Sequence, residues 1–214
     1  TANGTQTEIV RPLFAALGLE LDCDNDIQSD YFVPRDTESN DSVTELSKKV
    51  LQSKADLGVA FDVDGDRVVF VDTRGEFVPG DYSCSLIAKH FSGPIVTTVS
   101  TADVITGALR TRIGATYVIA KMQEVGSKFG FEPNGGGIFA DNFYGRDGGA
   151  TIIALLNILK DSLTGLSQNL SSLPKYYLFK DKIDCPFDKY DSILNSVKTR
   201  FADKDIDATD GLKI

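Results

Sequence analysis

Cysteine and histidine are scarce in this chain. Three cysteines, Cys23, Cys84 and Cys185, and one histidine, His90, occur among its 214 residues, and no CxxC motif is present. Three cysteines cannot form a complete disulfide framework, so we expect reduced thiols in a cytoplasmic protein. Long apolar runs are also lacking, since none approaches the roughly 18 residues of a membrane span. The polar N-terminus likewise does not resemble a signal peptide.

Basic residues are outnumbered by acidic ones. Lys and Arg total 22 against 31 Asp and Glu, which gives a net charge of −9. Nucleic acids and anionic membranes both require a basic face, so we expect neither as a partner. Hydrophobic residues make up 42% of the chain and charged residues 25%, as is ordinary for a globular protein. A chain of this length holds one large domain or two small ones.

Three carboxylates alternate in the segment DVDGDR, directly after the apolar run at 57–61. They are Asp62, Asp64 and Asp66. At neutral pH these side chains repel one another, and a hard divalent cation reverses that interaction. Ligands that are all oxygen indicate Mg²⁺ rather than zinc. The apolar run predicts a buried strand, which would place the carboxylates at its carboxyl end, where open α/β sheets bind ligands.

Other interpretations of this loop are weaker. An EF-hand needs glycine at the sixth loop position and glutamate at the twelfth, but counting from Asp62 these are Arg67 and Thr73. A solvated acidic turn is the plain structural alternative. Gly65 allows a tight turn, and Arg67 adds a fixed positive charge suited to a phosphate. We therefore favour a metal site.

Helical and extended patterns alternate along the chain, which predicts an α/β fold. Capping boxes at Thr5-x-x-Glu8 and Ser42-x-x-Glu45 precede two amphipathic stretches, and we expect Asp81 to cap a further helix. The expected helices are 9–17, 43–51, 82–91, 102–113 and 148–159, and the expected strands are 19–21, 57–61, 68–71, 77–78, 95–99, 116–119, 129–131 and 138–139. Residues 175–214 follow the pattern strand, helix, strand.

Three segments in order resemble one known family. GVAFDVDGDRVVFVDTRGEFVPGD is similar to the metal-binding loop of the α-D-phosphohexomutases, the phosphomannomutase/phosphoglucomutase superfamily, although Val63 stands where the family has glycine. FEPNGGGIF at 131–139 resembles the family's sugar-recognition loop, and GRDGGATIIALL at 145–156 resembles the segment that follows it. The start of the chain resembles the opening of the family's second domain, and DATDGLKI at the end resembles part of its fourth.

The resemblance implies a specific domain organisation. We expect two consecutive mixed-sheet α/β domains of the phosphohexomutase type and the start of an α+β domain. The boundaries would give a metal-binding domain at 1–79, a sugar-recognition domain at 80–172 and the beginning of a phosphate-binding domain at 173–214. Pro79-Gly80-Asp81 is the expected junction between the first two. Both ends of the chain would then lie inside a longer protein.

The family's reaction, by resemblance, moves a phosphoryl group between the 1- and 6-positions of a hexose. A phosphoserine donates its phosphate to a hexose phosphate, and the resulting hexose 1,6-bisphosphate turns around and returns the other phosphate. Asp62, Asp64 and Asp66 would hold Mg²⁺ as the cofactor, and Arg67 would offset the charge of the transferring phosphate. A surface arginine paired with a nearby acid is the plain alternative for Arg67.

The glycine-rich segment would recognise the sugar. By resemblance Glu132 and Asn134 bind adjacent hydroxyl groups from a loop made flexible by Gly135 and its neighbours, whereas a simple β-turn is the structural alternative. Arg146 is placed to touch phosphate. For Asp147 we favour the role of N-cap of the following helix.

Parts of the family's active site are missing from this sequence. The phosphoserine loop belongs to the family's first domain and the phosphate-clamping loop to its fourth, so the segment alone is expected to be inactive. The family also has more residues, including a lysine- or threonine-glycine turn, where Val118 runs directly into Ile119 here. Either a deletion or a segment skipped by the printed sequence accounts for this difference.

Two rival functions remain open. An aspartate-nucleophile phosphatase also uses Asp-x-Asp at a strand end, but it needs threonine where this chain has Asp66. A non-catalytic module that binds metal or sugar phosphate is the other. Mannose, glucose and glucosamine phosphates differ at C2, whereas Glu132 and Asn134 would contact C3 and C4, so the sequence does not select among them.

Overall fold

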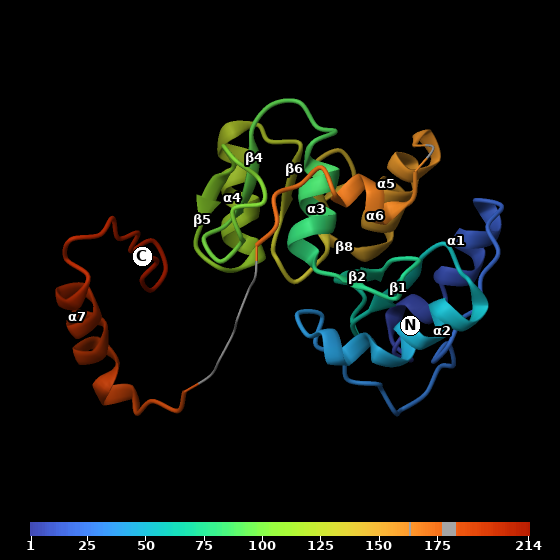
Figure 1. Ribbon diagram of the computed structural model, residues 1–214, viewed down its shortest axis with the longest axis horizontal. Helices are drawn as coiled ribbons and strands as arrows, with labels where there is room; N and C mark the ends of the chain where they lie inside the picture. Colours follow the sequence, from blue (N-terminus) through green and yellow to red (C-terminus); the bar gives the residue numbers. More distant parts are fainter. Residues whose placement is uncertain (163, 177–182) are drawn as a thin grey trace.

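The computed structural model describes residues 1–162, 164–176 and 183–214 and contains two β-sheets (Figure 1). The small sheet is antiparallel, in the order β1-β2-β3, and the large sheet is mixed, in the order β5-β4-β6-β7-β8. β4 is parallel to both β5 and β6, whereas β7 runs antiparallel to both β6 and β8. The strands are β1 (Gly58–Phe61), β2 (Val68–Val71), β3 (Phe77–Val78), β4 (Ile95–Thr98), β5 (Leu109–Thr111), β6 (Phe129–Phe131), β7 (Gly137–Phe139) and β8 (Phe143–Asp147). The expected mixed α/β class is confirmed.

Helices cover both faces of each sheet. The α-helices are α1 (Val10–Ala16), α2 (Thr44–Ser53), α3 (Gly80–Ala88), α4 (Ala115–Val125), α5 (Gly148–Asp161), α6 (Leu166–Leu170) and α7 (Tyr190–Arg200), with short 3₁₀ turns at η1 (Thr5–Thr7), η2 (Asn40–Val43) and η3 (Phe187–Lys189). α2 packs on one face of the small sheet and α4 on one face of the large sheet. α3 and α5 both contact β2, and they also contact strands of the large sheet (Figure 1).

One apolar core joins the two sheets. It includes Phe61 and Phe70 of the small sheet, Ile87 of α3, Phe131 of the large sheet and Leu155 of α5. Phe70, Phe131 and Leu155 are completely buried. Burial of this apolar surface is the main term that stabilises the arrangement. It also fixes the position of the loop between β1 and β2 relative to the large sheet.

The capping boxes expected from the sequence do not form. Thr5 lies in η1, and its hydroxyl donates to the backbone carbonyl of Asp64 rather than capping a helix. Ser42 donates to the carbonyl oxygens of Asp36 and Ser39. Asp81 lies in the first turn of α3, and its Oδ1 accepts from the Ala102 amide at 3.3 Å. In each case a tertiary or turn contact replaces the local hydrogen bond.

Two predicted elements exchange type. The helix expected at 102–113 is absent; residues 102–108 form turns, and β5 follows beside β4. The strand expected at 116–119 lies within α4. Its β-branched residues favoured a strand, but Val118 and Met122 are one helical turn apart and both completely buried, so packing decides. The strand expected at 19–21 is also not formed.

α4 continues without a break through Val118 and Ile119. The short connection lies elsewhere, between β4 and β5, where only residues 99–108 join two parallel strands. Parallel neighbours usually need a crossover of about a dozen or more residues, most often a helix. The connection between β4 and β5 is therefore shorter than a usual crossover and contains no helix.

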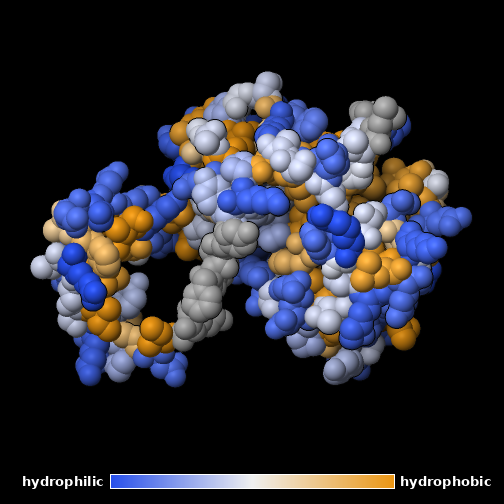
Figure 2. All heavy atoms as spheres, in the orientation of Figure 1, coloured by the Kyte–Doolittle hydropathy of each residue, from blue (hydrophilic) through white to orange (hydrophobic). Residues whose placement is uncertain are grey.

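The last described segment, 183–214, buries little. α7 confirms the expected helix but contains no buried residue, and Ile183 and Phe187 are 87% and 95% exposed. Figure 2 shows hydrophobic side chains gathered along this segment. The last expected strand is reduced to one bridge between Asp207 and Lys213. The first lies largely outside the described residues. No described helix is long and apolar enough to cross a membrane.

Candidate metal centre

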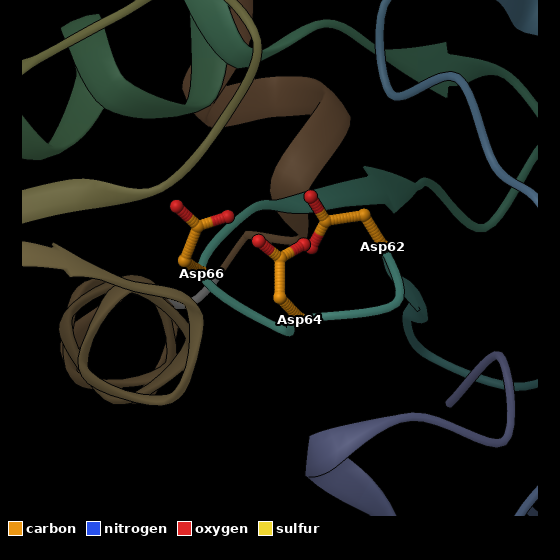
Figure 3. Close-up of side chains that lie close together, drawn as sticks. All are labelled: Asp62, Asp64 and Asp66. Atoms are coloured by element: carbon orange, nitrogen blue, oxygen red, sulfur yellow. The ribbon is translucent and has the colours of Figure 1, made fainter.

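The three aspartates of the acidic loop converge. One carboxylate oxygen from each of Asp62, Asp64 and Asp66 lies within 4.8 Å of the other two (Figure 3). The loop joins β1 to β2, which are antiparallel, so it closes a β-hairpin. The carboxylates lie at the carboxyl end of β1, as expected, but β1 is the edge strand of an antiparallel sheet. The hairpin nevertheless brings the carboxylates together as the alternating spacing predicted.

Asp62 is the buried member of the triad, with 6% exposure. Its Oδ1 accepts from the amides of Gly65 at 3.0 Å and Arg67 at 3.2 Å, which closes the loop around it. Burial raises the pKa of Asp62 to about 6, and repulsion by Asp66 and Asp64 adds to the rise, whereas the Arg67 amide opposes it. A cation between the carboxylates would relieve this repulsion.

Segments remote in sequence donate hydrogen bonds to backbone carbonyls in and next to the acidic loop. The Thr5 amide donates to the Val63 carbonyl at 3.0 Å, and Gln6 Nε2 donates to the Gly65 carbonyl at 2.9 Å. Arg35 Nη1 donates to the Phe61 carbonyl at 2.7 Å, one residue before Asp62. Sequence reasoning missed Arg35, which lies in a polar stretch without periodicity. Desolvation lowers the pKa of Arg35, and the charge of Asp62 offsets this only in part.

Arg67 projects beside the triad. Its Nε lies 3.5 Å from Asp62 Oδ2 and 3.8 Å from Asp66 Oδ1, and it has no hydrogen-bond partner although buried. Asp66 Oδ1 is also buried without a hydrogen bond. Buried polar atoms are normally satisfied, so Asp66 Oδ1 is an oxygen that a ligand could use. Three carboxylates with a free oxygen fit a hard divalent cation such as Mg²⁺.

The glycine-rich loop lies directly against the acidic loop. Gly135 and Gly136 have φ angles of +84° and +89°. A Cβ at Gly135 would lie 2.2 Å from the Val68 carbonyl oxygen, and one at Gly136 would lie 2.2 Å from that of Asp66. We expected flexibility from these glycines. The structure instead uses them for a close approach of two backbones.

Glu132 lies at the carboxyl end of β6, among the parallel strands of the large sheet. It is 3% exposed, and its Oε1 accepts from the Gly114 amide at 3.0 Å. Gly114 follows β5, and β5 and β6 flank β4 and run parallel to it, so the carboxyl ends of both flanking strands contribute to this position. Asn134 Oδ1, from the same loop, is buried without a partner. The turn Arg112-Ile113-Gly114 at this edge was missed, because we assigned it to a helix end.

Arg146 connects the two loops. Its Nε donates to Asp66 Oδ2 at 2.8 Å, and its Nη1 donates to Glu132 Oε2 at 2.8 Å. The sequence suggested a phosphate contact for this residue. In the structure its guanidinium is shared by two carboxylates, and the phosphate contact stays a prediction. No sequence signal pairs it with them, because Asp66 is 80 positions away.

Asp147, next to Arg146, caps α5. Its Oδ1 accepts from the Ala150 amide at 2.9 Å, as we expected. A Cβ on Gly148, the first residue of α5, would lie 2.6 Å from the Gly65 carbonyl oxygen. The start of α5 therefore abuts the acidic loop. The cap fixes the direction of the chain immediately after Arg146.

Comparison with known proteins identifies two family domains. The family model described as phosphoglucomutase/phosphomannomutase, alpha/beta/alpha domain II, matches residues 1–75, and the one described as domain III matches residues 79–177. A phosphoglucomutase/phosphomannomutase of Thermococcus kodakarensis is 33% identical over 231 residues, covering 100% of this chain and 50% of the relative. A phosphoglucosamine/phosphogalactosamine mutase of Sulfurisphaera tokodaii is 33% identical over 190 residues, covering 81% of this chain and 42% of the relative.

Solved structures agree with these matches. A phosphoglucomutase/phosphomannomutase family protein from Burkholderia thailandensis has a TM-score of 0.76 and 26% identity, over 99% of this chain and 49% of that chain. N-acetylphosphoglucosamine mutase from Aspergillus fumigatus, in complex with glucose 1,6-bisphosphate, has a TM-score of 0.58 at 17% identity, over 93% of this chain and 52% of that chain, and shares the fold. The chain thus spans about half the length of the relatives it matches. It belongs to the phosphoglucomutase/phosphomannomutase family, of which it carries domains II and III.

Proposed function

We propose that the whole protein is a magnesium-dependent phosphohexomutase of the cytoplasm. It would interconvert a hexose 1-phosphate and a hexose 6-phosphate through a phosphoserine and a hexose 1,6-bisphosphate. The observation that carries the proposal is the direct contact between a carboxylate triad and a loop with free polar groups, joined by Arg146. The family membership of domains II and III supports the same reaction class.

The acidic loop would serve the transferring phosphoryl group. Bound Mg²⁺ would act as a Lewis acid toward a phosphoryl oxygen. The three aspartates would hold it, and together they carry one negative charge more than the ion neutralises. Arg67, 39% exposed at its side chain and without a hydrogen bond at Nε, can turn toward an incoming phosphate and offset its charge.

The glycine-rich loop would bind the sugar. Asn134 Oδ1 has no partner in the protein and can accept from a sugar hydroxyl. Both oxygens of Glu132 already accept from protein donors, but each retains a second lone pair. Its fixed carboxylate can therefore accept from a hydroxyl without reorientation. The complex of the Aspergillus fumigatus enzyme with glucose 1,6-bisphosphate supports this ligand class.

Steady-state kinetics of the whole protein test this function. Glucose, mannose and glucosamine 1-phosphates are supplied with Mg²⁺ and catalytic glucose 1,6-bisphosphate, and formation of the 6-phosphate is followed. Asp64 is the exposed member of the triad, so D64N alters the metal site with the least effect on folding. We expect D64N to lower kcat roughly a hundredfold or more. D56N, the same change at an exposed residue ahead of β1, is the control and retains native turnover.

Two results would overturn the proposal. Net release of inorganic phosphate, with beryllium fluoride trapped on Asp62, would identify an aspartate-nucleophile phosphatase. Binding of sugar phosphate without any turnover by the whole protein would identify a binding module. The 214-residue chain assayed alone is expected to bind ligand without turnover, because no serine motif of the family occurs in it.

A further inference from the structure

Arg146 is the one described side chain that hydrogen-bonds to both the acidic triad and the glycine-rich loop. Its side chain is 17% exposed, and its partner Glu132 is 4% exposed at the side chain. Nε and Nη2 both face Asp66 Oδ2, while Nη1 faces Glu132 Oε2. A planar guanidinium with fixed donor directions can hold two carboxylates at once, which the single ammonium of lysine cannot do with the same geometry.

Because of this contact, the two carboxylate oxygens of Asp66 have different surroundings. Oδ2 is held by Arg146, whereas Oδ1 is buried, has no hydrogen bond and lies on the side of Arg67. Arg146 therefore fixes the rotamer that leaves Oδ1 for a cation. Partners that orient a ligating carboxylate in this way commonly change metal affinity by roughly 10- to 100-fold when they are removed.

The same contact fixes Glu132. Its Oε2 is held by Arg146 and its Oε1 by the Gly114 amide, so the carboxylate cannot rotate without breaking a hydrogen bond to a charged donor. Any change in how strongly Glu132 attracts Arg146 alters how strongly Arg146 attracts Asp66. The two carboxylates compete for one cation.

We infer that Arg146 is a positioning residue that couples the cation site to the hydroxyl-binding site, so that the state of Glu132 sets the affinity of the triad for Mg²⁺. When a sugar hydroxyl donates to Glu132, that carboxylate attracts Arg146 less, and the guanidinium is redistributed between its partners. The inference deepens the proposed function and rests on it for the identity of the ligand. Its mechanism rests only on Asp66, Glu132 and Arg146.

A double-mutant cycle read out by Mg²⁺ alone tests the coupling. Isothermal titration of Mg²⁺ into the 214-residue chain is carried out at about 0.15 M ionic strength, where long-range charge effects are screened. We expect R146M to weaken Mg²⁺ binding roughly tenfold. E132Q removes the negative charge that competes with Asp66 for Arg146. It should therefore weaken Mg²⁺ binding several-fold in the native chain and have almost no effect on Mg²⁺ binding in R146M.

Arg74 provides a matched control. It also bridges two carboxylates, buried Asp72 and exposed Glu76, but at the far end of β2. R74M removes the same type of contact and should leave the Mg²⁺ affinity within about twofold of native. If R146M does not fold, R146K takes its place; it keeps the charge, and we expect it to reduce the E132Q effect as well.

The outcomes separate this inference from the proposed function. An equal effect of E132Q with and without Arg146, or unchanged Mg²⁺ affinity in R146M, overturns the coupling. Failure of the native chain to bind Mg²⁺ overturns the coupling and the cation site together. A cycle with the expected non-additivity, in a whole protein that shows no mutase turnover, overturns the proposed function and supports the coupling.

Discussion

Two aspartates of the acidic loop each use one carboxylate oxygen for hydrogen bonds within the protein. Asp62 uses Oδ1 for two backbone amides, and Asp66 uses Oδ2 for Arg146. One oxygen of each lies within 4.8 Å of the other and of one from Asp64 (Figure 3). Such an arrangement costs free energy until a cation is bound, because the carboxylates repel one another at short range. This cost leads to a prediction about pH.

The pKa of Asp62 is raised from 3.8 to about 6, first by burial and then by Asp66 and Asp64. The folded chain therefore binds more protons than the unfolded chain between these values, so the contribution of Asp62 to stability falls as the pH rises through that window. D62N removes the charge and keeps an oxygen for the two amides. In EDTA at about pH 7 we expect D62N to be more stable than the native chain by on the order of 2 kcal/mol.

Thermal melts at about pH 4 and about pH 7 check this prediction. The advantage of D62N should largely disappear at the lower pH, where Asp62 is protonated. Added Mg²⁺ should stabilise the native chain and have little effect on D62N. A native chain that is more stable than D62N at about pH 7 without Mg²⁺ would contradict the predicted repulsion.

At the scale of elements, the site depends on a backbone-to-backbone contact between two loops. Gly136 lies against the carbonyl of Asp66, and α5 begins against the carbonyl of Gly65. Neither contact leaves room for a Cβ atom. The acidic loop and the glycine-rich loop are thus held together by packing as well as by Arg146.

Substituting Gly136 separates packing from backbone strain. Gly136 and Gly93 have φ angles of +89° and +93°, but a Cβ at Gly93 would meet nothing within 4 Å. G93A should cost about 1–2 kcal/mol, the cost of the left-handed conformation alone. G136A should cost several kcal/mol more and abolish Mg²⁺ binding. Equal losses in urea denaturation would show that the close approach is unimportant.

Capping of α5 gives another prediction at this scale. D147A removes the acceptor for the Ala150 amide and should lower the free energy of unfolding by about 1 kcal/mol. Asp141 is 75% exposed and pairs with Lys128, so D141A is a control in which no measurable change is expected. Chemical denaturation of the two variants measures the difference, and a loss of equal size in both would exclude a specific cap.

The sequence predicted the elements that carry strong local signals. β1, β2, β3 and α5 were predicted correctly because apolar runs and neighbouring glycine turns mark them in the sequence. The convergence of the aspartates followed from their alternating positions. α4 was misread because Thr116 to Ile119 is β-branched or aromatic, and only burial against the large sheet selects the helix. Arg35 and the shared contacts of Arg146 were unpredictable, since each joins segments far apart in the chain.

At the scale of the whole molecule, the two sheets share one core. Phe61 and Phe70 from the small sheet belong to the same buried cluster as Phe129 and Phe131 from the large sheet. The Ser167 hydroxyl of α6 donates to buried Asp72, which adds a polar link between the two parts. The domain boundary at residues 79 and 80, which remains our proposal, therefore separates two units of chain topology that share one hydrophobic core.

A shared core predicts cooperative unfolding. Far-UV circular dichroism and tyrosine fluorescence should report one transition for residues 1–172, with coincident midpoints. Separation of 1–79 from 80–172 would expose the apolar faces of β2, α3 and α5, so neither half should fold alone. Two resolved transitions, or a stably folded half expressed by itself, would contradict this account.

The central claim is that Asp62, Asp64 and Asp66 hold a divalent cation beside the glycine-rich loop. The most direct measurement is anomalous diffraction from crystals of the chain soaked in Mn²⁺, which accepts the same oxygen ligands as Mg²⁺. The account predicts one peak within about 2.0–2.3 Å of an oxygen from each of the three aspartates, with Arg146 still contacting Asp66. No peak among these carboxylates, in crystals that bind Mn²⁺ elsewhere, would contradict it.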